Sequence, residues 1–410
     1  MRFRHIYAVS DIHTDYKPNY NWAISLSGHS NDVLLCAGDV SDDLQTFEST
    51  MEALANSFGA VFFVPGNHDL WLQRHGADKG SDSLAKLSRL TATCHRCGVL
   101  TTPQRIAMAS GQEVSILPLL SWYHSSFDTE PDVDQLRLPS ARAVVSDYRA
   151  TEWPQPLKNG EDALSEYFDS LCDELPGASA VEQAAGRPGL TPLASYADAR
   201  APGVASVLSF SHFVPRIDLI PEKRYLTYPP LMKAVGSAPL GRRLAALRPD
   251  MHVFGHTHFG WDATLEDGIR YVQAALATPA ERRRRPRSLM VAYDLDLDPT
   301  SDQPRADAHG AALPLQIFDG DTGAFCPPRQ AAWSSHYANT PRVPQDTSPA
   351  PWVVDFYARK APGRLNLSAA EECERSEREK WRQLEQTVQS RQPSTARVGM
   401  FDVQRGRRQE

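Results

Sequence analysis

Short apolar runs in the first part of the chain alternate with stretches of helical periodicity. The runs at 5–10, 32–37 and 60–64 are rich in β-forming residues, and each is followed by a polar turn. The segments 20–26 and 44–58 between them have helical character. This β-α-β-α-β order predicts parallel strands whose carboxyl ends lie along one edge of a sheet, where open α/β folds form their sites.

The middle of the chain continues the strand pattern and contains an insertion. Further strands are expected at 113–120, 204–210, 251–254, 269–273 and 289–294, and a helix is expected at 162–172. Residues of roughly 121–203 are expected to form a cap or insertion at the site. Within it, 175–202 is rich in Ala, Gly, Pro and Ser without clear periodicity, which predicts a mobile surface insertion rather than core.

The last quarter of the chain differs in composition. Beyond Pro299 the sequence is polar and rich in proline, and Ser368 with Glu371 forms a capping-box pattern that predicts a helix near 368–390. We therefore expect a catalytic domain at 1–298, followed by a polar linker and C-terminal tail at 299–410.

Composition narrows the class of protein. With 410 residues, 41% of them hydrophobic, the chain can form one large α/β core. The net charge of −7 supplies no overall attraction to nucleic acid or to an anionic membrane, so nucleic acid is not the favoured partner. The sequence does not indicate an oligomeric state.

Several features predict a soluble intracellular protein. The six cysteines lie at irregular spacings, unlike a secreted disulfide framework. The first strand leaves no room for the apolar core of a signal peptide, and no apolar run approaches the roughly 20 residues needed to span a bilayer. We expect the cytoplasm or another intracellular soluble compartment, and no membrane partner.

Five short motifs rich in Asp, His and Asn follow predicted strands. They are DIH at 11–13, GDVSD at 38–42, GNHD at 66–69, SH at 211–212 and GHTH at 255–258. In an extended segment, two residues separated by one point to the same face, so DIH and GHTH can each direct two ligands to one place. One such motif alone is most often a surface turn or a satisfied core histidine, whereas five of them at strand ends predict a common site.

The residue types in these motifs indicate metal binding. The candidate ligands are Asp11, His13, Asp39, Asn67, His212, His256 and His258. Carboxylate, amide oxygen and imidazole without thiolate suit Mn, Fe, Zn or related divalent ions. Seven ligands favour two ions over one, because a structural zinc site closes with four ligands and a catalytic zinc typically takes three. We expect two divalent metal ions as cofactors, with a bridging carboxylate.

The order DxH, GDxxD, GNHD, a single His and GHTH over residues 11–258 resembles that of the calcineurin-like metallophosphoesterase superfamily. The resemblance implies an α/β (α+β) fold, a four-layer α/β/β/α sandwich of two mixed sheets with flanking helices, here with a C-terminal extension. It also implies that three residues hold the first ion, three hold the second, and one bridges them. The first set is Asp11, His13 and His258, the second is Asn67, His212 and His256, and the bridge is Asp39.

The resulting hypothesis is a hydrolase of phosphate esters, either a phosphomonoesterase (phosphatase) or a phosphodiesterase. Two ions about 3.5–4 Å apart activate a bridging hydroxide as the nucleophile for in-line displacement. The resemblance implies that His68 contacts substrate, and we expect it to protonate the leaving alkoxide or to stabilise charge, with Asp69 fixing its tautomer. The partner expected is a phosphorylated substrate, a small molecule, since these motifs identify chemistry and not substrate.

The alternative is a non-catalytic scaffold or protein-interaction module that keeps the metallophosphoesterase fold. Every ligand position is filled in this chain, which favours the enzyme. Bound metal together with cleavage of a chromogenic phenyl phosphate distinguishes the two hypotheses.

Four further residues are candidates for substrate binding. Arg216, Lys223 and Arg224 lie between two ligand motifs and can reach a substrate phosphate. Salt bridges within a surface loop explain these cations equally well. Tyr123 follows a predicted strand and is a candidate for lining the pocket, although packing in the core explains an aromatic residue there as well.

Overall fold

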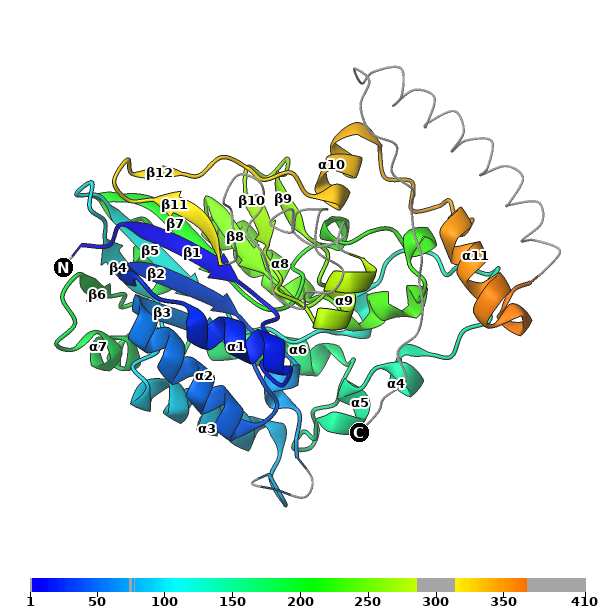
Figure 1. Cartoon of the computed structure of the whole chain (residues 1–410), viewed down its shortest axis with the longest axis horizontal. Helices are drawn as coiled ribbons and strands as arrows, with labels where there is room; N and C mark the ends of the chain where they lie inside the picture. Colours follow the sequence, from blue (N-terminus) through cyan, green and yellow to red (C-terminus); the bar gives the residue numbers. More distant parts are fainter. Residues whose placement is uncertain (1, 74–75, 77, 286–313, 367–410) are drawn as a thin grey trace.

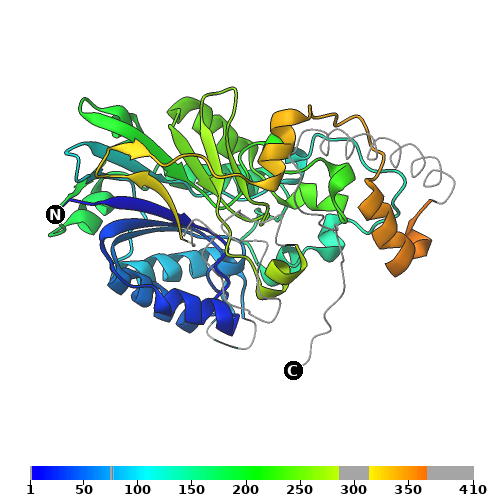
Figure 2. The same cartoon turned by 45° about the horizontal axis from the view of Figure 1, so that its top comes forward.

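Two mixed sheets lie face to face at the centre of the molecule, as Figures 1 and 2 show. The structure is a computed structural model, and it describes residues 2–73, 76, 78–285 and 314–366. Helices cover the outer sides of the two sheets. This arrangement confirms the predicted four-layer α/β/β/α sandwich.

The first sheet has five strands in the order β12-β11-β1-β2-β3. Its strands are β1 His5–Val9, β2 His29–Ala37, β3 Phe58–Val64, β11 Leu315–Asp319 and β12 Ala324–Phe325. The first three strands pair in parallel, as predicted. The half of β2 from Val33 to Ala37 is fully buried, because the sheet is covered on both faces.

The helices that follow β1, β2 and β3 in the chain lie on the outer side of this sheet (Figure 2). They are α1 Lys17–Ser25, α2 Leu44–Ser57 and α3 Ser83–Arg96. The side chain of Asp43 caps α2 by accepting a hydrogen bond from the backbone N–H of Thr46, and Asp82 caps α3 in the same way. Pro18 lies in the first turn of α1, where a missing N–H costs nothing, so this helix begins earlier than its apolar pattern predicts.

The strand β11 comes from the region predicted to be a linker and tail. It pairs antiparallel with β1, and its residues Leu315, Ile317 and Phe318 are buried in the sandwich. The predicted boundary at 298/299, the predicted strand at 289–294 and the predicted helix near 368–390 lie outside the described residues. Strand β11 therefore contributes to the core of the sandwich.

The second sheet has seven strands in the order β6-β4-β5-β7-β8-β10-β9. Its strands are β4 Gln104–Ala107, β5 Glu113–Pro118, β6 Leu190–Pro192, β7 Val204–Phe210, β8 Met251–Phe254, β9 Trp261–Thr264 and β10 Arg270–Gln273. The neighbours β5, β7, β8 and β10 all run parallel. Their carboxyl ends therefore share one edge of the sheet.

The region of the predicted insertion is made of short, well-packed elements. It contains α4 Ala141–Val144, α5 Asp147–Ala150, α6 Asp162–Cys172 and α7 Ala178–Ala184. The expectation that 175–202 lies outside the core is wrong. Strand β6 pairs with β4, and Leu193, Tyr196 and Ala199 are buried, because small and apolar side chains without periodicity still fill the edge of the second sheet.

The remaining α-helices come from the second half of the chain. They are α8 Ala238–Leu247, α9 Pro279–Arg284, α10 Ala332–Asn339 and α11 Pro351–Lys360. In Figure 1, α11 lies at the end of the molecule away from the amino terminus. Among the described residues, none of the helices has the length and apolar character that crossing a bilayer requires.

Candidate metal centre

The seven candidate ligands follow the carboxyl ends of five strands. Asp11 and His13 follow β1, Asp39 follows β2, Asn67 follows β3, His212 follows β7, and His256 and His258 follow β8. These strands belong to two different sheets, and a bridge between Ser10 and Ala275 joins the sheets at this edge. The face-to-face packing of the sheets thus brings all seven side chains to one place.

The backbone at the site adopts an uncommon conformation. Five of the seven candidate ligands have a positive φ: Asp11 (52°), His13 (47°), Asp39 (57°), His256 (73°) and His258 (54°). For a non-glycine residue this left-handed region costs on the order of 1 kcal/mol, and such residues cluster at functional sites. The turns are held by their own backbone hydrogen bonds, such as Asp11 N–H to Gly38 O at 2.9 Å and His13 N–H to Asp39 O at 2.8 Å.

Two glycines make the close packing of the ligands possible. A Cβ atom on Gly66 would lie 2.2 Å from Asp39 Oδ1, and one on Gly38 would lie 2.7 Å from His212 Nδ1. Side chains at these two positions would displace the candidate ligands, so the motifs require glycine there.

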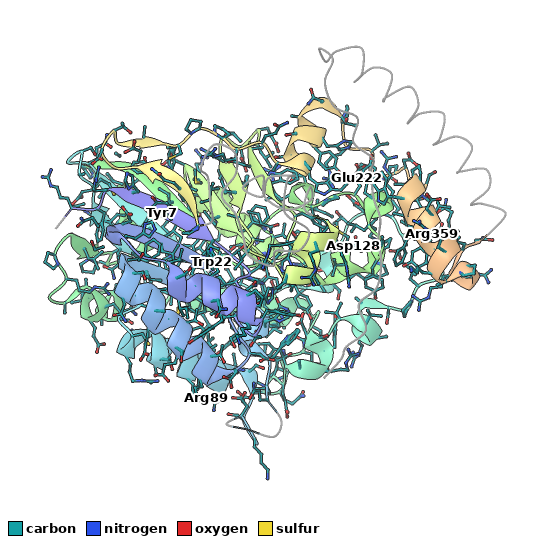
Figure 3. All side chains as sticks on the ribbon, viewed as in Figure 1. Tyr7, Trp22, Arg89, Asp128, Glu222 and Arg359 are labelled. Carbon is teal, nitrogen blue, oxygen red and sulfur yellow. The ribbon has the colours of Figure 1, made fainter. Side chains whose placement is uncertain are left out.

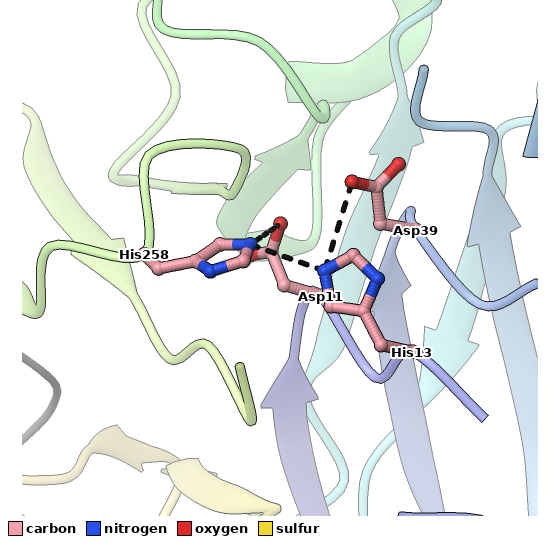
Figure 4. A group of neighbouring side chains, drawn as sticks. All are labelled: Asp11, His13, Asp39 and His258. Carbon is pink, nitrogen blue, oxygen red and sulfur yellow. Dashed lines mark hydrogen bonds and ion pairs between the residues drawn. The ribbon is translucent and has the colours of Figure 1, made fainter. Parts of the chain in front are cut away.

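Asp11, His13, Asp39 and His258 form the first group of ligand atoms, shown in Figure 4, and these atoms all lie within 4.8 Å of one another. His258 Nε2 is 3.2 Å from Asp11 Oδ1 and 3.2 Å from His13 Nε2. His13 Nε2 is 4.0 Å from Asp39 Oδ2. Imidazole nitrogens and carboxylate oxygens therefore converge on a single point.

Asp39 also belongs to a second group, with His212 and His256. Its Oδ1 atom is 3.5 Å from His212 Nε2. Asn67 completes this group, because its Oδ1 atom is 3.0 Å from His212 Nε2 and 2.9 Å from His256 Nδ1. The carboxylate of Asp39 thus faces both groups, one oxygen toward each.

Three of the histidines are oriented by acceptors behind them. His212 Nδ1 is 2.9 Å from Ala37 O, and His256 Nε2 is 2.9 Å from Ala234 O. His258 Nδ1 is 2.8 Å from Glu281 Oε2. An acceptor on one ring nitrogen places the proton there and leaves the other nitrogen free as a ligand.

Glu281 was not among the residues predicted for the site. It is the third residue of α9 and forms a capping box with Thr278. The segment TPAE that carries this box is visible in the sequence as a helix start, but nothing local indicates that its carboxylate also contacts a histidine 23 residues earlier.

In the metal-free site the candidate ligands differ in protonation, and His258 would have to lose a proton to bind a cation. Burial lowers the pKa of His13 and of His256 to about 3, so both are neutral and can offer a lone pair. Burial also opposes the charged form of His258, but the carboxylates of Glu281 and Asp11 outweigh it and raise the pKa to about 10. Burial and the neighbouring carboxylates raise the pKa of Asp39. The donor set of carboxylate, amide and imidazole fits divalent metal ions, whose identity it leaves open.

His68 lies at the rim of the first group. Its side chain is 30% exposed, and its Nε2 atom is 3.9 Å from Asp39 Oδ2. The predicted pairing of His68 with Asp69 is wrong. The Asp69 carboxylate accepts hydrogen bonds from the backbone N–H groups of four residues at 2.8–3.0 Å, namely Asp39, Val40, Ser41 and Gly66. Asp69 therefore holds together the loops that follow β2 and β3. Its position next to His68 in the sequence does not indicate this role.

The three predicted cationic substrate contacts have structural partners instead. Arg216 pairs with Asp218 and Asp267, each at 2.6 Å. Lys223 Nζ is 2.7 Å from Asp128, and Figure 3 shows Asp128 on the side of the molecule that carries α11.

The other two candidates are similarly engaged. Arg224 is 2.6 Å from Asp346 and lies over the ring of Tyr225. Tyr123 is fully buried against Phe213. Salt bridging and core packing, the alternatives considered for these residues, therefore account for them. Their partners are distant in sequence, so local pattern did not indicate them.

Comparison with known proteins agrees with this geometry. The family model of the calcineurin-like phosphoesterases matches residues 4–167, which include four of the seven candidate ligands (Asp11, His13, Asp39 and Asn67) as well as His68. Residues 4–167 thus match the calcineurin-like phosphoesterase family. The predicted family is confirmed, and with it the expectation of a metal-dependent phosphoesterase.

Two comparisons extend beyond the matched segment. The chain is 27% identical over 290 residues to the [acyl-carrier-protein] phosphodiesterase PptH of Mycobacterium tuberculosis, covering 68% of this chain and 80% of that protein. The crystal structure of the phosphopantetheinyl hydrolase PptH from Mycobacterium tuberculosis has a TM-score of 0.50 and 22% identity, covering 69% of this chain and 93% of that one. The structural likeness supports the fold of the calcineurin-like phosphoesterases for this chain.

Proposed function

We propose that this protein hydrolyses phosphodiesters at a site that holds two divalent metal ions. One observation carries this proposal: the two oxygens of Asp39 face two separate groups of ligand atoms. Asp11, His13 and His258 would hold one ion, Asn67, His212 and His256 would hold the other, and Asp39 would bind both. A single ion would leave half of these buried polar groups without a function.

The bound ions would supply the activation of water and neutralise charge on the phosphoryl oxygens. His68 would act on the substrate itself, since it is the partly exposed histidine beside the ligand groups. Burial and the neighbouring histidines lower the pKa of His68, so its ring is neutral and carries one N–H. A neutral imidazole is suited to donating a hydrogen bond to the ester oxygen as negative charge develops there.

The choice of a diester rests on the similarity to PptH, which is named as a phosphodiesterase of the acyl carrier protein. We propose the same substrate class here, a phosphodiester that joins a phosphopantetheine group to a carrier protein. This proposal replaces the free small molecule that the sequence led us to expect with a small group linked to a protein.

The test is a comparison of three substrates with the full chain loaded with Mn²⁺. We expect faster cleavage of bis(4-nitrophenyl) phosphate than of 4-nitrophenyl phosphate, and release of phosphopantetheine from a holo-acyl carrier protein, detected by mass spectrometry. The variant Asp39→Ala should cleave none of them. Preference for the monoester would contradict the diester proposal, and an inert protein without bound metal would favour the scaffold.

A further inference from the structure

A buried carboxylate outside the ligand set contacts the metal centre from the insertion. Asp147 is the first residue of α5, and it is only 1% exposed. Its Oδ1 atom accepts hydrogen bonds from Asn67 Nδ2 at 2.9 Å and from Trp71 Nε1 at 2.6 Å. One oxygen atom thus fixes two side chains of the segment that follows β3.

The bond to Asn67 decides which end of its amide faces the centre. Because Asp147 accepts from the amide nitrogen, the amide oxygen is turned toward His212 and His256, at 3.0 and 2.9 Å. Once ionised, the carboxylate can only accept, and it then excludes the reversed amide, which would present an NH₂ group where a ligand oxygen is needed.

The bond to Trp71 decides where His68 lies. The rings of Trp71 and His68 are stacked, with their centroids 3.6 Å apart and their planes at 28°. The ring of His13 packs edge-on against His68 at 4.7 Å. Within the described part of the chain, no hydrogen bond to a ring nitrogen of His68 is found, so ring packing is what holds this histidine in place.

The carboxylate is itself anchored by the insertion. The backbone oxygen of Asp147 accepts hydrogen bonds from Asn159 Nδ2 at 3.0 Å and from Thr151 Oγ1 at 2.8 Å. Asn159 Oδ1 in turn accepts from the indole N–H groups of Trp122 and Trp153 at 3.0 and 2.8 Å. The position of Asp147 therefore depends on a chain of partly buried hydrogen bonds.

We infer that Asp147 is a positioning residue that sets Asn67 for metal binding and, through Trp71, sets His68 for the substrate. Only the statement about His68 rests on the proposed function, because the orientation of Asn67 concerns metal binding alone. Asp147 gives the insertion a role: it supplies the acceptor that orients a ligand and a substrate-contacting residue at once.

Metal binding tests the first half. The full chain, stripped of metal, is titrated with Mn²⁺ in a calorimeter for the wild type, Asp147→Leu and Asp147→Asn. Leucine removes both acceptor oxygens, and we expect Mn²⁺ to bind about tenfold more weakly or worse. Asparagine keeps one acceptor oxygen and should restore binding to within about threefold of the wild type.

The control is Asp162→Asn. Asp162 is the first residue of α6, another helix of the insertion, and its carboxylate contacts His124 and Ser126. The control should leave Mn²⁺ binding unchanged. A folded Asp147→Leu protein that binds Mn²⁺ as tightly as the wild type would overturn the inference for Asn67. Should Asp147→Leu not fold, Asp147→Asn is compared with the control Asp162→Asn. Mn²⁺ binding by Asp147→Asn that is more than about threefold weaker than binding by the control would overturn the predicted rescue.

The variant Trp71→Phe tests the second half, because it removes the indole N–H and keeps an aromatic ring. We expect unchanged Mn²⁺ binding, and a kcat for bis(4-nitrophenyl) phosphate that is several-fold lower at an unchanged KM. An unchanged kcat would overturn the role assigned to Trp71. If the wild type cleaves no ester, the proposed function fails, while the Mn²⁺ titrations still decide whether Asp147 positions Asn67.

Discussion

Individual residues at this site combine a strained backbone with buried polar atoms that face more than one neighbour. Asp39 shows this best: its φ is positive, its carboxylate is buried, and its two oxygens face different ligand groups. A conformation that costs free energy is retained where the surrounding structure requires it. The proposed bridging role gives a reason for this requirement.

At the scale of the residue, His68 offers the clearest separation of substrate contact from metal binding. Replacing His68 with phenylalanine keeps a ring against Trp71 but removes the N–H. Loss of one donor to a developing charge costs roughly 10²-fold in kcat. We expect this loss in steady-state assays with bis(4-nitrophenyl) phosphate, while elemental analysis still finds the wild-type metal content. Loss of metal in this variant would show that His68 is instead a ligand.

At the scale of the element, helix α9 supports the first ligand group through Glu281. Glutamine at 281 can preserve the capping box with Thr278 but loses the negative charge beside His258. Changing such an outer partner of a ligand typically lowers metal affinity 10–100-fold. We therefore expect Glu281→Gln to weaken Mn²⁺ binding by about tenfold in a calorimetric titration, with little change in helix stability.

A helix cap remote from the site provides the control. Asp82→Ala removes the cap of α3 and should cost about 1 kcal/mol in the free energy of unfolding. It should not change Mn²⁺ affinity. Equal weakening of metal binding by both variants would mean that helix stability, and not the contact with His258, is responsible.

The local sequence pattern predicted several of the strands and helices that position the site. Helix α6 spans Asp162–Cys172 as expected, and strands β1 to β3 end at their motifs, because periodicity and burial are local properties. Strand β11 was not predicted, since its pairing with β1 joins segments more than 300 residues apart. Asp147 and Glu281 were missed for the same reason: each contacts a ligand through the fold and not through a motif.

At the scale of the molecule, the buried histidines make stability depend on pH when metal is absent. The pKa values of His13 and His256 are lowered to about 3 from 6.5, so the unfolded chain binds more protons than the folded chain below pH 6.5. Because these histidines are buried in their neutral form, the free energy of unfolding falls as the pH drops from about 6.5 toward 3. The loss is up to about 1.4 kcal/mol per pH unit for each group.

His258 acts in the opposite direction. Its pKa is raised to about 10, so its contribution is complete below 6.5 and is lost as the pH rises toward 10. The metal-free chain should therefore have its highest melting temperature near neutral pH, measured by thermal unfolding in a chelator across pH 4–10. A melting temperature that rises steadily as the pH falls below 6.5 would contradict the neutral burial of His13 and His256.

The central claim is that one carboxylate joins two metal ions, and counting bound Mn²⁺ per chain tests it most directly. Elemental analysis of the wild type after reconstitution and desalting should give two ions per chain. The Asp39→Ala variant, with its fold intact by circular dichroism, should retain at most one. A wild type that holds a single ion, or an Asp39→Ala variant that still holds two, would contradict the proposed dinuclear site.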